Sequence, residues 1–465
     1  MSQTGITGTS HGIQSQAGQT VSLPARTVAV IGAGASGLCT AKHLLEAGLD
    51  VTIFEIGTQV GGLWCYMNDN GRSSAYRTLH INTAKNMTNF SDFKFRDDVQ
   101  RFPSHEDVHA YLKEYAEHFG VMERIEFKAK IKAVTPLFEP GKDDSRWEIE
   151  TAGGRKRSFD NVCVCTGHLT KPMDVPEFKD NFQGEYVHSH DYKEPDPYMG
   201  KRICVVGVGN SAVDIASDVC VYAKRCVLVA RTGVWIAPKL LFGVAFTDIT
   251  EMFMKTWVPE WFRSRALTFL IWCVHGDMKK IGLPPITKKV HPTSSATVVN
   301  DIAYDRIFVK QGIDKVEGKT LHFVDGTSEE FDVLITATGY LIELPFLSQD
   351  IVPLEGNNLK LYKRIVQPNW PGLYFVGMAN VTTALNVSYE HQAKWVREFI
   401  VGNAALPSAQ EMYADIEEQN EFLRTHYKQT PRHTIEEEHL RYFPLLKKSL
   451  REAIARKQRD FPRAA

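Results

Sequence analysis

Two glycine-rich stretches have the residue types and spacing that bind the phosphates of a dinucleotide. In "VIGAGASGLCTA", Gly32, Gly34 and Gly37 occupy the three positions of the G-x-G-x-x-G pattern. The first glycine allows a tight turn, the second lets the backbone approach a pyrophosphate, and the third lets helix and strand pack closely. The phosphate is expected at the N-terminus of the following helix, where unpaired N–H groups favour an anion. The predicted cofactor-binding residues of this stretch are Gly32, Ala33, Gly34, Ala35, Ser36 and Gly37.

The residue that ends the next strand indicates which nucleotide each stretch suits. Glu55 follows the first stretch at the place where a carboxylate binds a ribose diol. In the second stretch, "VVGVGNSAVDIA", the pattern is Gly207, Gly209 and Ala212, and Arg231 stands where the first stretch has its acid. A guanidinium pairs with a 2'-phosphate that a carboxylate would repel. The first stretch is therefore predicted to bind FAD and the second NADPH, with a solvated strand-end charge as the alternative for Arg231.

The elements around both stretches predict an α/β fold with two Rossmann-like domains. Strand, turn, helix and strand follow one another in residues 27–55 and again in 201–231, which is the order of a βαβ unit in a parallel sheet. Further buried strands are expected at 161–168, 331–340 and 371–380. Because the second unit lies between strands that end in "CTG" and "ATG", the NADPH domain is expected to be inserted into the FAD domain.

The predicted domain boundaries follow from this insertion. The FAD domain covers 26–175 and 325–465 with a C-terminal helical tail, and the NADPH domain covers 176–324 with a Trp-rich helical insertion at about 235–300. Residues 1–25 are rich in Ser, Thr, Gly and Gln and are predicted to be a disordered extension.

Two segments of the tail and the insertion carry further expectations. Residues 251–275 are dense in Trp, Phe and Met and are expected to form core or dimer-interface helices, with a lipid-facing or substrate-channel surface as the alternative. In "TIEEEHLRYF", Thr434 and Glu437 have the spacing of a helix capping box.

Composition excludes several classes of protein. A formal net charge of -1 gives no reason to expect a nucleic acid partner. No apolar run is long enough for a membrane span. The cysteine usage is typical of a reducing compartment, so a cytoplasmic location is expected. The eight cysteines are scattered among apolar residues, and no metal-ligand cluster is found. Cys163 and Cys165 are the only close pair; they could make a disulfide reductase, but their place in a buried strand favours packing.

The stretch "FQGEYVHSHDYKEP" identifies a family. Phe182, Gly184, His188 and Tyr192 have the spacing F-x-G-x-x-x-H-x-x-x-Y, which resembles the identifying motif of class B flavin-containing monooxygenases. Lys193 follows, as in the oxygenases of nitrogen and sulfur, whereas type I Baeyer-Villiger enzymes have Trp at the position of Tyr192.

Other stretches resemble the same family over residues 27–400. "GGLW" is similar to its flavin-contacting turn, which implies flavin contacts for Gly62, Leu63 and Trp64. "HINTAKNMTNF" resembles its active-site segment, which implies a catalytic role for Asn82 at the oxygenated flavin and at NADP, with Thr83 beside it. Asn86 departs from the Glu found in many relatives. In the NADPH stretch the resemblance implies nucleotide contacts for Asn210, Ser211 and Asp214.

The resemblance implies an activity. In the family NADPH reduces FAD, dioxygen forms a C4a-hydroperoxyflavin, and a soft nitrogen or sulfur nucleophile of a small molecule takes one oxygen atom. The protein then mainly binds, orients and excludes water. Two alternatives remain open: Baeyer-Villiger oxidation of ketones by the same intermediate, and a slow NADPH-oxidising flavoprotein that acts as a sensor. The expected partners are the substrate and O2, and a homodimer or association with a membrane surface remains open.

Overall fold

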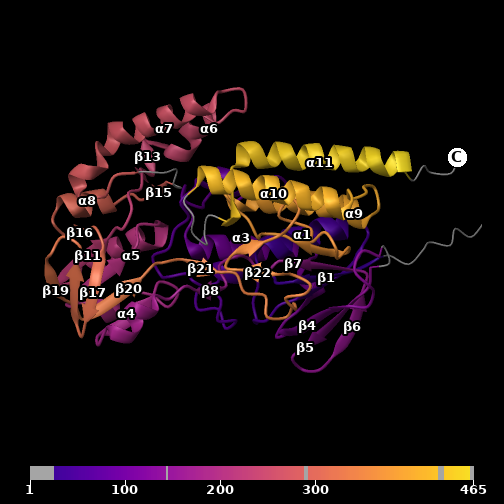
Figure 1. Cartoon of the computed structure of the whole chain (residues 1–465), viewed down its shortest axis with the longest axis horizontal. Coiled ribbons are helices and arrows are strands. Elements are labelled where there is room, and N and C mark those ends of the chain that lie inside the picture. The colour runs from indigo at the N-terminus through magenta and orange to yellow at the C-terminus, as the bar shows by residue number, and fades with distance from the viewer. Residues whose placement is uncertain (1–25, 143–144, 287–291, 428–433, 461–465) are drawn as a thin grey trace, which may run out of the picture.

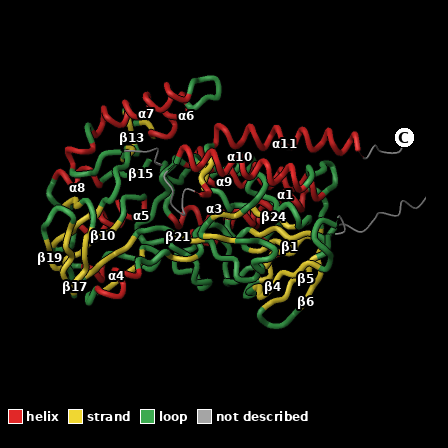
Figure 2. The backbone as a smooth tube through the Cα atoms, viewed as in Figure 1, coloured by secondary structure: helices red, strands yellow, loops and turns green. Residues whose placement is uncertain are grey.

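Two five-stranded parallel sheets organise the protein. The computed structural model describes residues 26–142, 145–286, 292–427 and 434–460 (Figure 1). Figure 2 shows most strands in two groups, with loops and the strand β21 between them. The predicted extension at 1–25 lies outside the described residues. Both sheets carry helices on one face, so the predicted α/β class is confirmed.

The first sheet contains the first glycine-rich stretch. Its strand order is β24 (Leu373–Phe375), β7 (Asn161–Val164), β1 (Thr27–Ile31), β2 (Asp50–Phe54) and β3 (Ile125–Glu126), all parallel. Five helices bury their apolar sides on one face: α1 (Ala35–Glu46), α3 (His105–His118), α9 (Leu385–Ile400), α10 (Ala409–His426) and α11 (His439–Asp460). The other face packs on the antiparallel sheet β4 (Ile131–Pro136), β5 (Trp147–Thr151) and β6 (Lys156–Phe159). The carboxyl ends of β1 and β2 thereby meet at one edge, where ligands of such sheets bind.

The second sheet repeats this plan around the second glycine-rich stretch. Its order is β16 (Phe308–Lys310), β11 (Arg225–Val229), β10 (Arg202–Val206), β20 (Val333–Thr336) and β9 (Glu185–His188), all parallel. One face packs on α5 (Asn210–Cys220) and α8 (Val298–Ala303). The other packs on β17 (Ile313–Glu317) and β18 (Thr320–Phe323), which form an antiparallel sheet with β19 (Ser328–Glu330).

The chain crosses between the two sheets twice, and the crossings lie together. β8 (Lys171–Pro172) pairs antiparallel with β21 (Tyr340–Leu341), and both lie between the two groups of strands in Figure 1. Strand β20 hydrogen-bonds to β10 and β9, so by sheet membership the return to the first sheet begins after Thr336, later than the boundary expected at residue 325. The other predicted boundaries stay predictions.

The Trp-rich insertion forms two helices, α6 (Phe246–Phe253) and α7 (Glu260–His275). In α7 only Ile271 is fully buried, so the expectation of core helices is wrong for most of this stretch. Within the described ranges, no helix combines the length and the apolar content that crossing a membrane requires.

The expected capping box at Thr434 is also wrong. Glu436–Glu437 forms β26, which pairs with β25 (Asn380–Val381), and α11 begins only at His439. The Glu437 carboxylate accepts a hydrogen bond from Arg364 instead of capping a helix.

The remaining elements are α2 (Lys85–Thr88), α4 (Pro176–Asn181), β12 (Ile236–Ala237), β13 (Leu240–Leu241), β14 (Val244–Ala245), β15 (Thr293–Ser294), β22 (Leu354–Glu355), β23 (Asn358–Leu359) and the 3-10 helices Gly62–Trp64, Met122–Arg124, Asp196–Tyr198 and Met278–Ile281.

Candidate functional site

The first glycine turn (residues 32–37) joins β1 to α1 in a conformation that needs its glycines. Gly32 has φ +105°, and a Cβ on it would lie 2.8 Å from the Cys165 carbonyl oxygen. A Cβ on Gly37 would lie 1.9 Å from the Gly32 carbonyl oxygen, so helix and turn can approach only without it. No side chain caps α1 at Gly34, which leaves its first N–H groups for an anion.

The Glu55 side chain is hydrogen-bonded to this turn. It is buried, and its Oε2 atom accepts the Ala33 backbone N–H at 2.8 Å. Its Oε1 atom accepts the Gly57 N–H at 2.9 Å and the Asn70 side-chain amide at 3.4 Å. An ionised carboxylate has about four acceptor positions. One remains for a ribose hydroxyl, so the residues of this turn fit the predicted dinucleotide.

The predicted flavin-contacting turn packs on the first glycine turn. Residues 62–64 form a 3-10 helix, and the Gly61 N–H donates to the Ala33 carbonyl oxygen at 2.9 Å. A Cβ on Gly62 would lie 3.1 Å from the Cα of Gly34. The structure therefore brings Gly62, Leu63 and Trp64 beside the residues that the sequence singled out for the same nucleotide.

The second glycine turn (residues 207–212) joins β10 to α5 with the same geometry. Gly207 has φ +125°, and a Cβ on it would lie 2.7 Å from the Ala337 carbonyl oxygen. Gly209 caps α5 without a side-chain hydrogen bond. The Asn210 side chain accepts the Ser294 N–H at 2.9 Å, which ties this turn to β15.

The other predicted residues of the second site lie around the turn. Ser211 is half-buried in the first turn of α5, and Arg231 is exposed just beyond the end of β11. No ion pair joins Arg231 to a carboxylate in the parts of the chain that the structure describes. Asp214 accepts the Tyr76 hydroxyl at 3.0 Å, and burial raises its pKa to about 6.

We call the part of the chain that builds the first sheet the first half and the part that builds the second sheet the second half. A cavity of about 630 Å³, the Asn82 cavity, lies where these two halves meet. Asn82 and Thr83 line it beside Thr382 from the first half, Asn210 and Ser294 from the second half, and α6 and α7 of the insertion. The Asn82 Oδ1 atom is buried and has no hydrogen-bond partner among the described residues. Leaving a buried acceptor unpaired costs about 1–3 kcal/mol, so a ligand that donates to it would be favoured.

The walls of the Asn82 cavity combine apolar and ionisable side chains that the sequence analysis missed. Apolar contacts come from Trp235, Phe246, Leu267 and Ile271. Burial lowers the pKa of both Lys239 and His439, which line the cavity. The Lys239 ammonium donates to the Ile81 carbonyl oxygen at 3.4 Å, next to Asn82 in the chain. His439 Nδ1 lies 2.9 Å from the Thr382 hydroxyl. No local pattern marks these residues, because tertiary folding alone brings them to Asn82.

The F-x-G-x-x-x-H-x-x-x-Y motif ties the two halves together. Tyr192 is fully buried, and its hydroxyl donates to Asp218 of α5 at 2.5 Å. The Lys193 ammonium donates to the Ser73 carbonyl oxygen at 2.8 Å and to the His190 carbonyl oxygen at 2.9 Å. The motif thus holds the segment after the flavin-contacting turn against the second sheet, which fixes the spacing of the two nucleotide turns.

The cysteine pair has the environment of packing residues. Cys163 and Cys165 are free and buried, and desolvation raises the pKa of both thiols. A thiol held in its protonated form is a poor nucleophile. This geometry does not support the disulfide reductase alternative.

Comparisons with known proteins agree over nearly the whole chain. The profile of the family described as "FMO-like: Flavin-binding monooxygenase-like" matches residues 25–455. Flavin-containing monooxygenase 5 of Oryctolagus cuniculus is 34% identical over 439 residues, which cover 89% of this chain and 81% of the rabbit protein. Dimethylaniline monooxygenase (N-oxide-forming) 4 of Rattus norvegicus is 34% identical over 424 residues, covering 86% of this chain and 74% of the rat protein.

Solved structures show the same fold. The S-allyl-L-cysteine S-oxygenase of Allium sativum has a TM-score of 0.70 and 25% identity, with 96% of this chain and 95% of the garlic chain covered. An oxidised steroid monooxygenase bound to NADP has a TM-score of 0.66 and 16% identity, with 92% and 97% covered, which is a likeness of fold alone.

Proposed function

Because the chain belongs to the flavin-binding monooxygenase-like family, we propose that it transfers one oxygen atom from O2 to a soft nitrogen or sulfur atom of a small molecule in the Asn82 cavity. The family establishes the coarser description: the protein is a flavin-dependent monooxygenase that uses FAD and NADPH. The assignment of individual residues and of the substrate class is our proposal.

The first glycine turn and Glu55 are proposed to hold FAD. The N–H groups at the start of α1 would bind its pyrophosphate, and the Glu55 carboxylate would accept a ribose hydroxyl while it keeps the Ala33 N–H. Bound FAD, once reduced by NADPH, supplies the activation of dioxygen that no side chain provides.

The second glycine turn is proposed to hold NADPH. Ser211 and the start of α5 would bind its pyrophosphate, and the exposed Arg231 guanidinium would pair with the 2'-phosphate. Asp214 is proposed to act indirectly, since its carboxylate accepts from Tyr76 and thereby fixes α5 against the first half. Two motifs with similar spacing would thus serve a resident cofactor and an exchanging one.

Asn82 is the observation that carries the proposal for the reaction site. Its buried Oδ1 atom lacks a partner among the described residues and it lines a cavity shared by both halves. In the bound enzyme the Asn82 amide would donate and accept hydrogen bonds that orient the cofactors. The apolar side chains of α6 and α7 would exclude water from the same space.

The proposed preference for nitrogen or sulfur rests on the more similar relatives. The rat and garlic proteins are named for N-oxide formation and S-oxygenation. The cyclohexanone and steroid monooxygenases are 16% to 17% identical and share only the fold. Apolar walls favour an uncharged amine or thioether over a strongly solvated substrate.

A substrate panel tests this proposal. The purified protein would be given NADPH with a tertiary amine, a thioether or a cyclic ketone, while O2 uptake and oxygenated product are measured. We expect the amine or thioether to be converted. Conversion of the ketone alone would favour Baeyer-Villiger oxidation, and a yellow protein with no O2 uptake on any substrate would favour the slow sensor.

The exposed aromatic residues of α7 and of the loop before it are proposed to form an association surface. Trp257 is 81% exposed, Trp261 62%, Phe269 61% and Trp272 54%. Soluble monomers rarely expose so many aromatic side chains together. We propose that a second copy of the chain covers them in a homodimer. Light scattering should then give the mass of a dimer. The mass of a monomer, together with sedimentation of the protein with anionic vesicles, would favour association with a membrane surface instead.

A cytoplasmic location is proposed from the thiols. All eight cysteines are free and seven are buried, which is typical of proteins in a reducing compartment. Fractionation of cells that express the tagged protein would test this location.

A further inference from the structure

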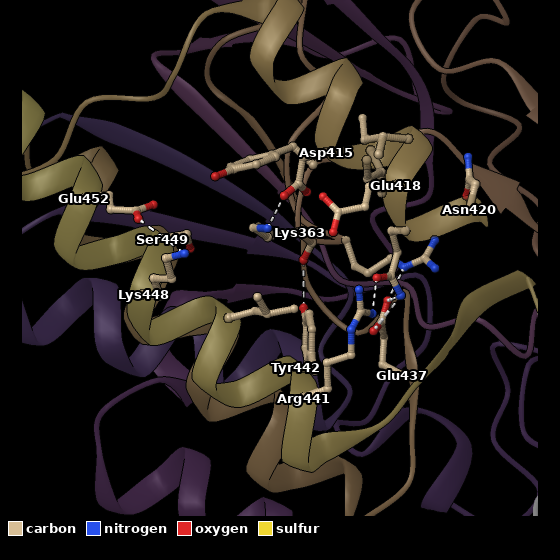
Figure 3. Close-up of a pocket in the computed structure, with 16 residues that line it drawn as sticks. Lys363, Asp415, Glu418, Asn420, Glu437, Arg441, Tyr442, Lys448, Ser449 and Glu452 are labelled. Atoms are coloured by element: carbon tan, nitrogen blue, oxygen red, sulfur yellow. Dashed lines mark hydrogen bonds and ion pairs between the residues drawn. The ribbon is translucent and has the colours of Figure 1, made fainter. Parts of the chain in front are cut away.

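A second cavity lies away from the Asn82 cavity and shares no lining residue with it. It has a volume of about 230 Å³, and it lies between residues 361–364 and the facing sides of α10 and α11. Figure 3 shows charged side chains from all three segments around it. We call it the Arg364 cavity. Nothing in the proposed oxygenation uses it.

Two guanidinium groups and one carboxylate form a hydrogen-bonded cluster at the inner end of the Arg364 cavity. Arg364 and Glu437 are 5% and 3% exposed, and Arg364 Nε donates to Glu437 Oε1 at 2.7 Å. Arg441 donates to the Gln419 side-chain oxygen, and Gln419 donates to both Glu437 oxygens at 3.0 Å. Two guanidinium groups therefore surround one carboxylate.

The other charges of the lining balance each other or lie in solvent. Lys363 is paired with Asp415, as Figure 3 shows. Lys448 and Glu452 are 3.8 Å apart on the exposed side of α11, and Glu418 is exposed on α10. Solvent screens these rim charges, so a ligand inside the cavity would chiefly meet the cluster of Arg364, Arg441 and Glu437.

One donor group of the buried part is unsatisfied. Arg364 Nη2 is buried and has no hydrogen-bond partner among the described residues. A buried donor without an acceptor costs about 1–3 kcal/mol, and more when it is charged. An oxyanion is the acceptor that a guanidinium binds best, because its oxygens match the two N–H directions.

We propose that the Arg364 cavity is a second ligand site, which binds a small organic anion through one carboxylate or similar oxyanion group at Arg364 and Arg441. The anion pairs with both guanidinium groups and takes the free N–H groups of Arg364 Nη2. Leu361, Ile416 and Leu445 also line the cavity and contact the apolar part of the ligand. The volume is below the roughly 300–1,000 Å³ of pockets for drug-sized ligands, so the ligand is small.

A chain of hydrogen bonds connects this cavity to the first glycine turn. The Tyr442 hydroxyl donates to the Lys363 carbonyl oxygen at 2.7 Å and accepts from Gln392 at 2.7 Å. Gln392 in turn accepts the Gly377 N–H at 2.9 Å. A Cβ on Gly377 would lie 3.1 Å from the Cβ of Ser36, so this residue packs on the first glycine turn.

These hydrogen bonds link the walls of the Arg364 cavity to the framework of the proposed FAD site. The binding of the anion does not rest on that site.

Calorimetry on the full-length holoenzyme tests the binding. The probes are benzoate and butanoate, compared with acetate and inorganic phosphate at constant ionic strength. Arg441→Gln removes one guanidinium from a half-buried position. The double variant Arg364→Met with Glu437→Leu removes both members of a buried ion pair. Replacing such a pair by apolar residues of similar size often leaves the stability of the protein unchanged. Lys447→Gln makes the same charge change as Arg441→Gln on the exposed side of α11, outside the cavity.

We expect one molecule of benzoate or butanoate to bind per chain, more tightly than acetate or phosphate. Arg441→Gln should weaken binding about tenfold, since a charge-assisted hydrogen bond contributes about 1.5–3 kcal/mol. The double variant should abolish it, and Lys447→Gln should leave it within about twofold. No heat from any probe, or equal affinity in all variants, would overturn the site. Binding of phosphate alone would contradict the proposal that the ligand is an organic anion. No turnover is needed, so a failure here is distinct from failure of the oxygenation proposal.

Discussion

Glu55 Oε2 accepts the backbone N–H of Ala33 at 2.8 Å, so the acid directly after β2 also holds the glycine turn that follows β1. The same carboxylate accepts the Gly57 N–H at 2.9 Å through Oε1. Glu55 therefore has a structural task before any nucleotide arrives. A ribose hydroxyl would bind to a carboxylate whose position two backbone amides already fix.

Glu55→Ala should lose FAD affinity and stability together, whereas Glu55→Gln should lose FAD affinity with a smaller loss of stability, since its amide oxygen can still accept one of the two backbone N–H groups. The Ala variant leaves the N–H groups of Ala33 and Gly57 unpaired in a buried place, at about 1–3 kcal/mol each. Gln keeps one acceptor oxygen but no charge, so about a tenfold weaker affinity for FAD is expected. Fluorescence titration of the apoprotein with FAD and thermal unfolding measure the two effects.

The exposed Glu123→Gln is the control for loss of one negative charge. If Glu55→Ala bound FAD as tightly as the unmodified protein, Glu55 would have no part in the nucleotide site.

The glycine turns could be predicted because each is complete within a short piece of sequence. Gly32, Gly37 and Glu55 belong to one βαβ unit, and their contacts follow from the spacing of that unit. Lys239 and His439 could not be predicted, because their approach to Asn82 depends on how α6 and α11 pack. The error at Glu437 has the same origin: its spacing fits a helix cap, but the buried Arg364 guanidinium is a stronger partner.

The domain crossing shows how a correct strand can be given to the wrong sheet. Periodicity predicts a buried strand at 331–340, and β20 is that strand. Pairing is not encoded locally, because both sheets present an apolar neighbour. β20 pairs with β10 through Val205 and Ile335, and its position in the second sheet follows from that long-range pairing.

Arg231→Ala should weaken binding of NADPH much more than binding of NADH. Removing a guanidinium from a 2'-phosphate costs about 1.5–3 kcal/mol, which is at least tenfold in the Michaelis constant. NADH has no such phosphate and should change less than about twofold. Initial rates of NADPH and NADH oxidation measure this, with the exposed Arg451→Ala on α11 as the control. Equal effects on both nucleotides would leave Arg231 as a solvated charge.

Asn82→Leu should uncouple NADPH oxidation from product formation. Leu has a similar volume but cannot accept the hydrogen bond for which the Asn82 Oδ1 atom is free. We expect flavin reduction to continue while product falls at least tenfold and hydrogen peroxide rises. Stopped-flow absorbance, product analysis and a peroxide assay measure the three quantities.

The exposed Asn86→Leu tests whether the position matters. It makes the same change outside the cavity and should retain product formation. Unchanged coupling in Asn82→Leu would remove this residue from the reaction site.

Asp214→Asn should stabilise the protein at neutral pH and not at acidic pH. Burial raises the pKa of Asp214 from an ordinary value of 3.8 to about 6, with nearby Lys239 acting in the opposite direction. Between pH 4 and 6 the folded state keeps a proton that the unfolded state has lost, so stability falls as pH rises through this window. Asn avoids this loss and can still accept from the Tyr76 hydroxyl. A gain of about 3 kcal/mol is therefore expected at pH 7.5, and none at pH 4. Thermal midpoints of both proteins across this range measure the difference, and the exposed Asp350→Asn is the control for net charge. The raised pKa of Asp214 would be contradicted if Asp214→Asn, relative to the unmodified protein, gained no more stability at pH 7.5 than at pH 4.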